Sequence, residues 1–282
     1  MRPSMMLGRS GIDTANVLIQ RGLSADNSQP TGDGWLMRTS DPDRSARYTD
    51  FQALPALWAG TLALNYVDNS KGQAFDTISG KSNVLFYFTG LASVLPSLAT
   101  NSFRPGAVAD SLTSFGGVLP DGAGQMPITA WLDAGATGSY GTVEEPCNYT
   151  EKFPQASVLI DQYWRGASLI EAYWKSVAQL GQGLFIGEPL AQPFRDSPSF
   201  TISGNNYLIS TRALRPGSHY ELDYRTSSSG NWISLASFTT AARAQQQNLT
   251  APRPPATATE LRWMGPCPTN AEQSCTLASS SN

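Results

Sequence analysis

The feature that most constrains the fold of this chain is a continuous apolar run at residues 83–90, which reads NVLFYFTG. A strand with one face in water alternates apolar and polar side chains, but the positions between Asn83 and Thr89 are all apolar or aromatic. Such runs are typical of strands buried on both faces, as in parallel sheets covered by helices on either side. The run therefore predicts a central strand with Leu85 and Phe86 in the core.

Strand and helix patterns alternate from the start of the chain to Phe194. Strands are predicted at residues 34–39, 61–67, 83–90, 108–115, 136–143 and 184–187, and helices at residues 13–22, 125–134, 154–165 and 168–180. This alternation is typical of α/β proteins with a mostly parallel sheet flanked by helices. We therefore expect residues 1–195 to form one α/β domain.

Two of the predicted helices carry specific signals. In the first helix, Val17, Leu18 and Ile19 are expected to point inward, and Gly22 is expected to end the helix. In the last helix, Ser168 and Glu171 form the capping-box pattern S-x-x-E ahead of apolar residues at helical spacing. Both helices are thereby predicted to place an apolar face against the sheet.

After Phe194 the pattern changes to short alternating runs separated by turn clusters. Examples are FTISG, YLISTRAL and WISLASF, and no helical periodicity occurs among them. This pattern predicts a small all-β sandwich at residues 196–265, with TELRWMG as its final strand. Residues 266–282, which are polar and end in TLASSSN, are expected to form a flexible tail.

Composition and charge narrow the classes of partner and location. A formal net charge of -3 argues against a nucleic-acid partner, which requires a basic surface. No run of about 18 apolar residues is present, so no transmembrane segment is predicted. The first residues, MRPSMMLGRSG, lack the apolar core of a signal peptide. A composition rich in Ser, Thr, Asn and Gln and poor in Lys favours an extracytoplasmic location with the leader removed; a cytoplasmic location is the alternative.

The chain contains three cysteines and one histidine, His219. Cys267 and Cys275 can close a small disulfide loop in the tail, and Cys147 would then be the one cysteine outside a disulfide. With a single histidine and no C-x-x-C pair, we expect neither a zinc site nor a cofactor. The pattern G-x-x-G-x-x-G at residues 135–141 departs from the dinucleotide fingerprint and favours close packing of strand and helix.

The sequence resembles an uncharacterised family of bacterial exported proteins, strongly at residues 82–194 and weakly at residues 2–66. Members share blocks of the form GATGSYGTVxEPCN, KFP, EAYWKSV and GQGLFIGEPLAxPF. The corresponding blocks stand here at residues 135–148, 152–154, 171–177 and 181–194. More distantly, the layout is similar to the caspase and gingipain cysteine-peptidase fold, which implies an immunoglobulin-like identity for the β module.

The resemblance also bears on the start of the chain. Family members carry roughly another hundred residues before the segment that matches Arg2, and these would supply the first strands of the sheet. A late start, a truncation or proteolytic maturation would each account for the difference. We therefore expect other protein subunits to complete the domain, with Pro3 to Leu7 the most exposed part of the uncovered edge.

A caspase-like peptidase implies a thiolate and an imidazole at the ends of adjacent strands. The histidine of that fold lies in a His-Gly step, which reads Thr89-Gly90 here. The next strand end, where the cysteine would lie, contains Ser114 but no thiol. Relatives often read A-D-H-L-T-S where this chain reads ADSLTS, so Ser111 replaces the family histidine. The resemblance therefore implies a scaffold without the dyad, in which Thr89 and Ser114 remain as possible ligand contacts.

Three other groups are candidates for chemistry. Cys147 follows a strand on its carboxyl side, where α/β proteins contact ligands, although a free cysteine is more often a small buried apolar residue. Glu144, Glu145 and Glu188 could converge for acid–base chemistry or Ca²⁺ binding; the alternative is that they cap helices or bond backbone amides. His219 is interpreted as a strand histidine rather than a partner of Cys147.

These observations favour a non-catalytic, exported α/β scaffold that acts through protein–protein contacts in a larger assembly. The first alternative is a cysteine-type hydrolase or peptidase that uses Cys147. The second is a cell-envelope or carbohydrate-binding module. A sugar-stacking surface could be formed by the aromatic side chains at residues 163–164 and 173–174, but their spacing fits two helices packed on the sheet better.

Overall fold

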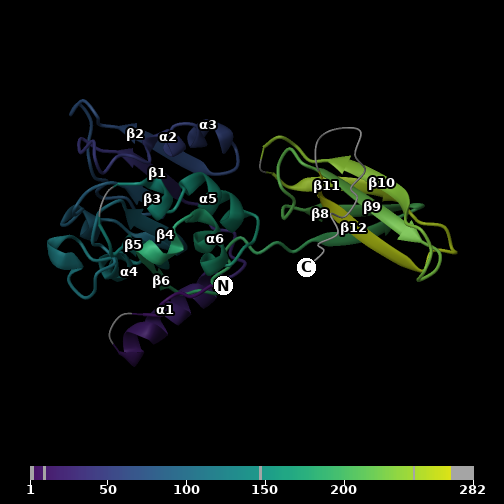
Figure 1. Cartoon of the computed structure of the whole chain (residues 1–282), viewed down its shortest axis with the longest axis horizontal. Helices are drawn as coiled ribbons and strands as arrows, with labels where there is room; N and C mark the ends of the chain where they lie inside the picture. The colour runs from purple at the N-terminus through teal and green to yellow at the C-terminus, as the bar shows by residue number, and fades with distance from the viewer. Residues whose placement is uncertain (1–2, 9–10, 146–147, 244, 268–282) are drawn as a thin grey trace. The chain divides into compact units, whose positions relative to one another are not determined.

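The computed structural model describes residues 3–8, 11–145, 148–243 and 245–267 of this chain (Figure 1). The chain divides into two compact units between Arg195 and Asp196, and each unit is described by itself.

A six-stranded sheet forms the centre of the first unit, in the order β2-β1-β3-β4-β5-β6 (Figure 1). Its strands are β1 (Asp33–Arg38), β2 (Ala63–Asp68), β3 (Val84–Thr89), β4 (Phe103–Ser111), β5 (Gly138–Thr142) and β6 (Gly183–Gly187). Neighbouring strands from β2 to β5 are parallel, and only β6 runs antiparallel to its neighbour β5. The predicted α/β class with a mostly parallel sheet is confirmed. All six residues of β3 are buried, as the apolar run predicts.

Helices cover both faces of this sheet. They are α1 (Ile12–Ala25), α2 (Tyr48–Phe51), α3 (Leu54–Leu57), α4 (Thr129–Ala134), α5 (Ala156–Trp164) and α6 (Leu169–Ser176), with 3-10 turns η1 (Ser97–Thr100), η2 (Gly122–Gly124), η3 (Thr150–Lys152) and η4 (Leu180–Gln182). On one face Tyr87 packs edge-on against Trp131 of α4, with ring centroids 5.2 Å apart. On the other face Phe88 lies against Phe51 of α2, with centroids 6.5 Å apart. Successive β3 side chains thus fill two separate aromatic cores.

The first helix differs from its prediction. Of the three residues expected to point inward, only Leu18 is buried, and Val17 is 59% exposed. Consecutive helical residues are about 100° apart, so three in a row cannot share one face. The helix also continues through Gly22 to Ala25. Gly22 is required for packing rather than termination, because a Cβ there would lie 2.6 Å from a carboxylate oxygen of Glu188.

The segment before α1 lies on the edge of the sheet. The amide of Met6 donates to the carbonyl of Phe185 at 2.9 Å, and the amide of Gly187 donates to the carbonyl of Met6 at 3.0 Å. Met6 therefore forms a parallel bridge with Ile186 of β6. Within Pro3 to Leu7, expected to be the most exposed part of an uncovered edge, Pro3, Ser4 and Leu7 are exposed, whereas Met6 pairs with β6 and is partly buried.

The capping box of α6 forms as predicted. A carboxylate oxygen of Glu171 accepts hydrogen bonds from the amide and the hydroxyl of Ser168, each at 2.9 Å. These bonds lower the pKa of Glu171 below its ordinary value of about 4.5.

We expect Ser168→Ala to lower the free energy of unfolding by about 1 kcal/mol, because the cap satisfies polar groups at the helix start. Since the folded pKa of Glu171 is depressed, its contribution is present above about pH 4.5 and is lost as the pH falls through the folded value. Urea titration at neutral and acidic pH measures both effects. Gln155→Ala is the control, because Gln155 precedes α5 without a side-chain cap; an equal loss there would contradict the prediction.

The second unit consists of two three-stranded antiparallel sheets, in the orders β10-β9-β12 and β11-β8-β7 (Figure 1). Its strands are β7 (Ser199–Ser203), β8 (Asn206–Thr211), β9 (His219–Arg225), β10 (Ile233–Thr239), β11 (Gln247–Pro252) and β12 (Glu260–Cys267). A small core of Leu222, Phe238 and Ala251 joins the two sheets. Cys267, at the end of β12, is disulfide-bonded, and its predicted partner Cys275 lies outside the described residues.

Candidate functional site

The two strand ends at which the caspase-like resemblance would place a dyad are neighbours. Thr89 at the end of β3 is in register with Ser111 at the end of β4. The loop after β4, together with the loops after β1 and β5, lines a pocket of about 330 Å³ at the carboxyl edge of the sheet. Its lining residues are Asp43, Arg44, Leu112, Thr113, Ser114, Glu145, Asn148 and Phe153. We call this the carboxyl-edge pocket.

Arg44 is the principal cation of this pocket, and it is held within the protein. Its guanidinium lies 2.7 Å from the carboxylate of Asp41, and its Nε donates to the hydroxyl of Thr113 at 3.3 Å. Partial burial favours the neutral carboxyl, but the hydrogen bonds from Arg44 outweigh it and lower the pKa of Asp41. The charge of Arg44 is therefore largely balanced before any ligand enters.

The loop after β4 is braced from two sides. The hydroxyl of Thr113 and the amide of Phe115 both donate to Oε1 of Gln125, at 2.7 and 2.8 Å. The hydroxyl of Thr142 donates to the carbonyl of Thr113 at 2.7 Å. On the far wall, the side-chain amide of Asn148 donates from Nδ2 to the carbonyl of Asp43 at 2.7 Å and ties the loop after β5 to the loop after β1. The polar groups of the pocket thus hold its walls in place.

The predicted site residues are distributed unevenly around this pocket. Ser114 and Glu145 line it, and Cys147, between Glu145 and Asn148 in the sequence, lies outside the described residues. Glu144 is exposed beside it. Thr89 is buried and does not line the pocket.

Ser111, at the position where the resemblance implies a histidine, is part of the internal hydrogen bonding. Its hydroxyl accepts from the amide of Leu91 at 3.0 Å and donates to the carbonyl of Leu91 at 2.7 Å. The side chain therefore joins the end of β4 to the loop after β3. The hydroxyl thus uses its one proton and one of its acceptor positions for bonds within the protein.

The expected convergence of Glu188 with Glu144 and Glu145 is wrong. Because β6 is antiparallel to β5, its carboxyl end lies beside the start of β5, where Glu188 donates its amide to the carbonyl of Thr137 at 3.0 Å. The two other glutamates follow the end of β5, at the opposite edge of the sheet. Burial raises the pKa of Glu188, whose carboxylate lies against Gly22 of α1.

A buried ion pair beneath the pocket was not predicted. The guanidinium of Arg47 lies 2.7 Å from the carboxylate of Asp110 in β4, and the two side chains are only 3% and 1% exposed. Arg47 also donates to the carbonyls of Thr89 at 2.8 Å and Pro154 at 3.1 Å. It therefore ties together β3, β4 and the start of α5. The signal in the sequence was an aspartate at the end of an apolar strand, which requires a partner when buried.

Aromatic rings surround this ion pair. The guanidinium of Arg47 lies 5.5 to 6.0 Å from the ring centres of Phe51, Phe88 and Phe153. Burial raises the pKa of Asp110, while the charge of Arg47 acts in the opposite direction. Phe153 also lines the carboxyl-edge pocket, so a single ring separates the ion pair from the pocket.

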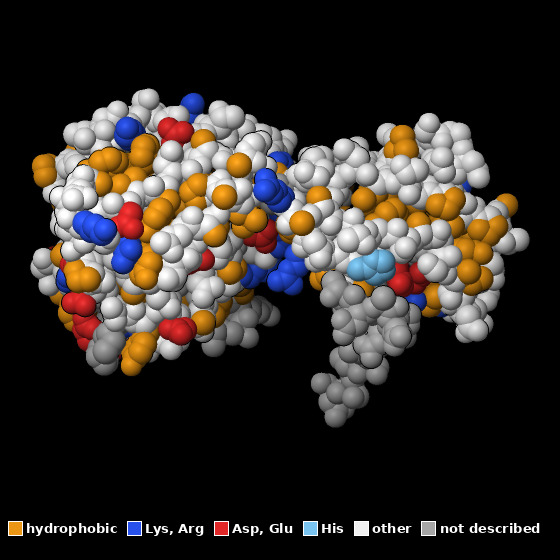
Figure 2. Space-filling view, turned by 90° about the horizontal axis from the view of Figure 1, so that it is seen from above, with side chains coloured by type: hydrophobic (Ala, Val, Ile, Leu, Met, Phe, Trp, Pro, Cys, Tyr) orange, Lys and Arg blue, Asp and Glu red, His pale blue; other side chains and the backbone are white. Residues whose placement is uncertain are grey.

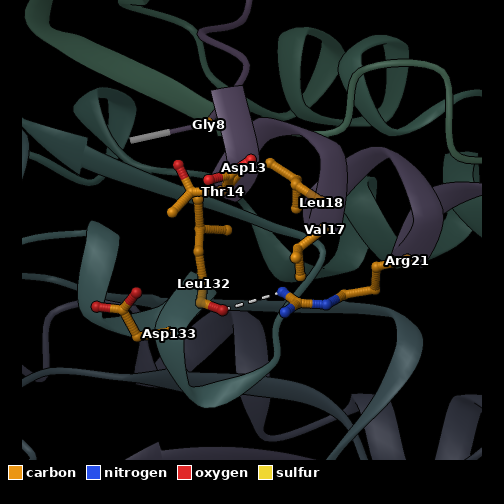
Figure 3. A pocket seen from close by; sticks show the side chains of 8 residues that line it. All are labelled: Gly8, Asp13, Thr14, Val17, Leu18, Arg21, Leu132 and Asp133. Atoms are coloured by element: carbon orange, nitrogen blue, oxygen red, sulfur yellow. Dashed lines mark hydrogen bonds between the residues drawn. The ribbon is translucent and has the colours of Figure 1, made fainter. Parts of the chain in front are cut away.

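A second depression lies between α1 and α4 (Figure 3). It has a volume of about 280 Å³ and is lined by Gly8, Asp13, Thr14, Val17, Leu18, Arg21, Leu132 and Asp133. The guanidinium of Arg21 donates to the carbonyl of Leu132 at 3.0 Å (Figure 3). It also donates to the carbonyl of Ala136 at 2.5 Å. Arg21 thereby satisfies carbonyl groups at the end of α4. Because its one cation has this structural role, this depression is a weaker candidate than the carboxyl-edge pocket.

The other candidates named from the sequence are the aromatic side chains of α5 and α6 and the single histidine, His219. Tyr163, Trp164 and Tyr173 are buried in the core, which supports helix packing rather than sugar stacking. His219, the single histidine, lies at the surface of the second unit with its Nε2 3.7 Å from the carboxylate of Glu221 (Figure 2). In the described part of the chain, no three His, Cys, Asp or Glu side chains gather as a metal site would require.

Comparison with known proteins assigns neither a family nor a function to this chain. No protein-family model, no curated protein and no solved structure matches this chain. Among the residues described, no helix has the length and apolar character needed to cross a membrane.

Proposed function

We propose that this chain is a non-catalytic, exported scaffold with a caspase-like α/β unit and an immunoglobulin-like module, acting through contacts with other protein subunits. The observation that carries the proposal is the state of Ser111. At the strand end where relatives have histidine, its hydroxyl bonds both the amide and the carbonyl of Leu91. A histidine can act as a general base near neutral pH, whereas a serine hydroxyl bonded in this way serves to hold two segments together.

The hydrogen bonding of the carboxyl-edge pocket supports the same proposal. Arg44 is paired with Asp41, Thr113 bonds Gln125, and Asn148 bonds a backbone carbonyl. Among the described residues that line the pocket there is neither a thiol nor an imidazole. An active site of the cysteine-peptidase class needs a nucleophile and a base within hydrogen-bond reach of each other. The pocket as described supports recognition better than catalysis.

The thiol of Cys147 provides the test. On this proposal no imidazole activates it, so its rate of alkylation by iodoacetamide should rise with pH around the value of about 8.5 for the thiol of a free cysteine. The rate of alkylation against pH, followed by mass spectrometry, measures this midpoint, and Cys147→Ser identifies the signal. A thiolate already formed near neutral pH would overturn the proposal.

A cysteine-type hydrolase that uses Cys147 is the second candidate. It is favoured by one observation: Glu145 and Asn148, on either side of Cys147 in the sequence, line the carboxyl-edge pocket. On this alternative, the thiolate would attack a carbonyl carbon of a substrate oriented by Arg44 and form a thioester, with the amine or alcohol expelled after taking a proton. Water would then hydrolyse the thioester and release the acid and the free thiol. Labelling of Cys147 by a peptide acyloxymethyl ketone, prevented by prior heat denaturation, distinguishes this candidate from the first.

A further inference from the structure

Among the described residues, the two sheets of the second unit have four edge strands, and three of them carry the features that protect an edge from pairing with another chain. Such features are charges, prolines, bulges and covering elements. Strand β12 contains Glu260, Arg262 and Pro266, and β11 ends at Pro252. Strand β10 has a register shift near Ser234 and lies against β11. The fourth edge, β7, reads SFTIS; it has no charge and no proline, and all five residues are exposed.

The backbone groups at the free edge of β7 follow from its hairpin with β8. Ser203 and Asn206 are paired across a two-residue turn, so they form a hydrogen-bonded pair, as do Thr201 and Leu208 two positions on. The amides and carbonyls of the intervening residues, Phe200 and Ile202, therefore point away from β8. These four groups face the open edge of the sheet.

The same two residues carry the exposed apolar side chains. Phe200 is 56% exposed and Ile202 is 58% exposed, although both lie on the face of the sheet that carries Tyr207 and Ile209. The ring of Phe200 contacts that of Tyr207, with centroids 4.6 Å apart. Thr201 projects from the opposite face. The free hydrogen-bonding groups and the uncovered apolar surface of this edge thus coincide.

We propose that β7 is a self-association edge, where two copies of this chain pair their β7 strands antiparallel about Thr201. The sequence S-F-T-I-S is nearly symmetric about this residue, as an isologous interface requires. In that register Phe200 lies opposite Ile202 of the second copy and forms a hydrogen-bonded pair with it, so all four free backbone groups are satisfied. Aromatic and β-branched residues are favourable cross-strand partners.

The partner is a second copy because this edge offers no charge for a different partner to match. The pairing joins the two β7-containing sheets into one six-stranded sheet, with Phe200 and Ile202 of both copies in a single apolar cluster. This inference goes beyond the scaffold function and does not depend on the carboxyl-edge pocket. Since one short strand from each copy forms the contact, the interface falls at the small end of specific interfaces, and dimer formation should be reversible and concentration-dependent.

Sedimentation equilibrium of the full chain tests the proposal through Thr201. Thr201 is exposed on the outer face and would lie directly opposite its own copy across the two-fold axis. Thr201→Lys and Thr201→Glu each place like charges opposite one another and should weaken the dimer by about tenfold or more. An equimolar mixture of the two variants should restore association, because unlike charges then face each other. Thr250→Lys, the same change on the exposed outer face of edge strand β11, should leave the dimer unchanged.

A covalent version gives a positive signal. Directly opposed residues in a non-hydrogen-bonded antiparallel pair have Cα atoms about 4.5 Å apart, within the range that a disulfide spans. Under mild oxidation Thr201→Cys should therefore yield a cross-linked dimer, and Thr250→Cys should not. A monomeric wild-type chain at every concentration, a mixture that fails to recover, or equal behaviour of the two positions would each overturn the proposal.

Discussion

Replacement of Asp110 by Asn is expected to lower the free energy of unfolding by about 3–5 kcal/mol, the cost of breaking a buried ion pair from one side. The substitution keeps the shape of the side chain but leaves the guanidinium of Arg47, which is 3% exposed, without a counter-charge. Arginine remains protonated even when buried, so deprotonation cannot remove the charge that the substitution leaves unpaired. Urea denaturation monitored by tryptophan fluorescence measures the change.

Two further variants show whether the loss of stability in Asp110→Asn comes from the unpaired charge of Arg47. Asp161→Asn removes the carboxylate of the partly exposed pair with Arg165, and it should cost less than about 1 kcal/mol. The double variant Arg47→Met, Asp110→Leu removes both charges and should be more stable than Asp110→Asn, because apolar replacement of a buried pair is often neutral. Burial raises the pKa of Asp110, so an Asp110→Asn cost no larger than that of Asp161→Asn would mean that the carboxyl is already protonated in the folded protein.

The parts of the fold that the sequence predicts are those with a local signature. The strand β3 is buried on both faces, so its side chains are apolar at successive positions, and this run by itself identifies a buried strand. The capping box of Ser168 and Glu171 lies within four residues and forms without help from distant parts of the chain. In both cases the physical cause and the sequence pattern occupy the same few positions.

The direction of β6 could not be predicted, and it decides the position of one candidate site residue. The short run GLFIG is compatible with a parallel or an antiparallel strand, because neither its length nor its composition distinguishes them. Its antiparallel course places Glu188 at the opposite edge of the sheet from Glu145. A grouping that depends on strand direction therefore cannot be inferred from residue type and spacing alone.

The candidate site itself depends on contacts between residues far apart in the sequence. Arg47 and Asp110 meet only because α2 follows β1, which neighbours β3 in the sheet, while Asp110 ends β4 on the other side of β3. Similarly, the pocket wall formed by Arg44 rests on Thr113 of a different loop. The predicted strand ends lie within about one residue of the observed ones except for β4, which ends at Ser111 rather than Phe115. The partners across these ends come from the order of the strands.

Replacement of Gly90 by Ala is expected to disrupt the carboxyl-edge pocket and lower the free energy of unfolding by about 1–3 kcal/mol, the usual cost of overpacking. A Cβ at this position would lie 1.8 Å from the carbonyl oxygen of Arg44, so the backbone of the turn after β1 must move. The carbonyl of Gly90 also accepts a hydrogen bond from the hydroxyl of Thr39 at 2.8 Å, which the same movement would strain. The glycine of the Thr89-Gly90 step is therefore needed for the close approach of two backbones, whether or not a histidine precedes it.

The displaced turn is the one that carries Arg44, so the effect should be visible in the pocket as well as in stability. Amide chemical shifts of residues 41–45 and of Thr113 should change in Gly90→Ala, because the bond between Arg44 and Thr113 depends on the position of that turn. Gly181→Ala is the matched control, since a Cβ there meets nothing within 4 Å, and it should leave both stability and these shifts unaltered. If Gly90→Ala were as stable as Gly181→Ala, the turn after β1 would have to be free to move, and the carboxyl-edge pocket would not have the fixed walls on which its proposed role in recognition depends.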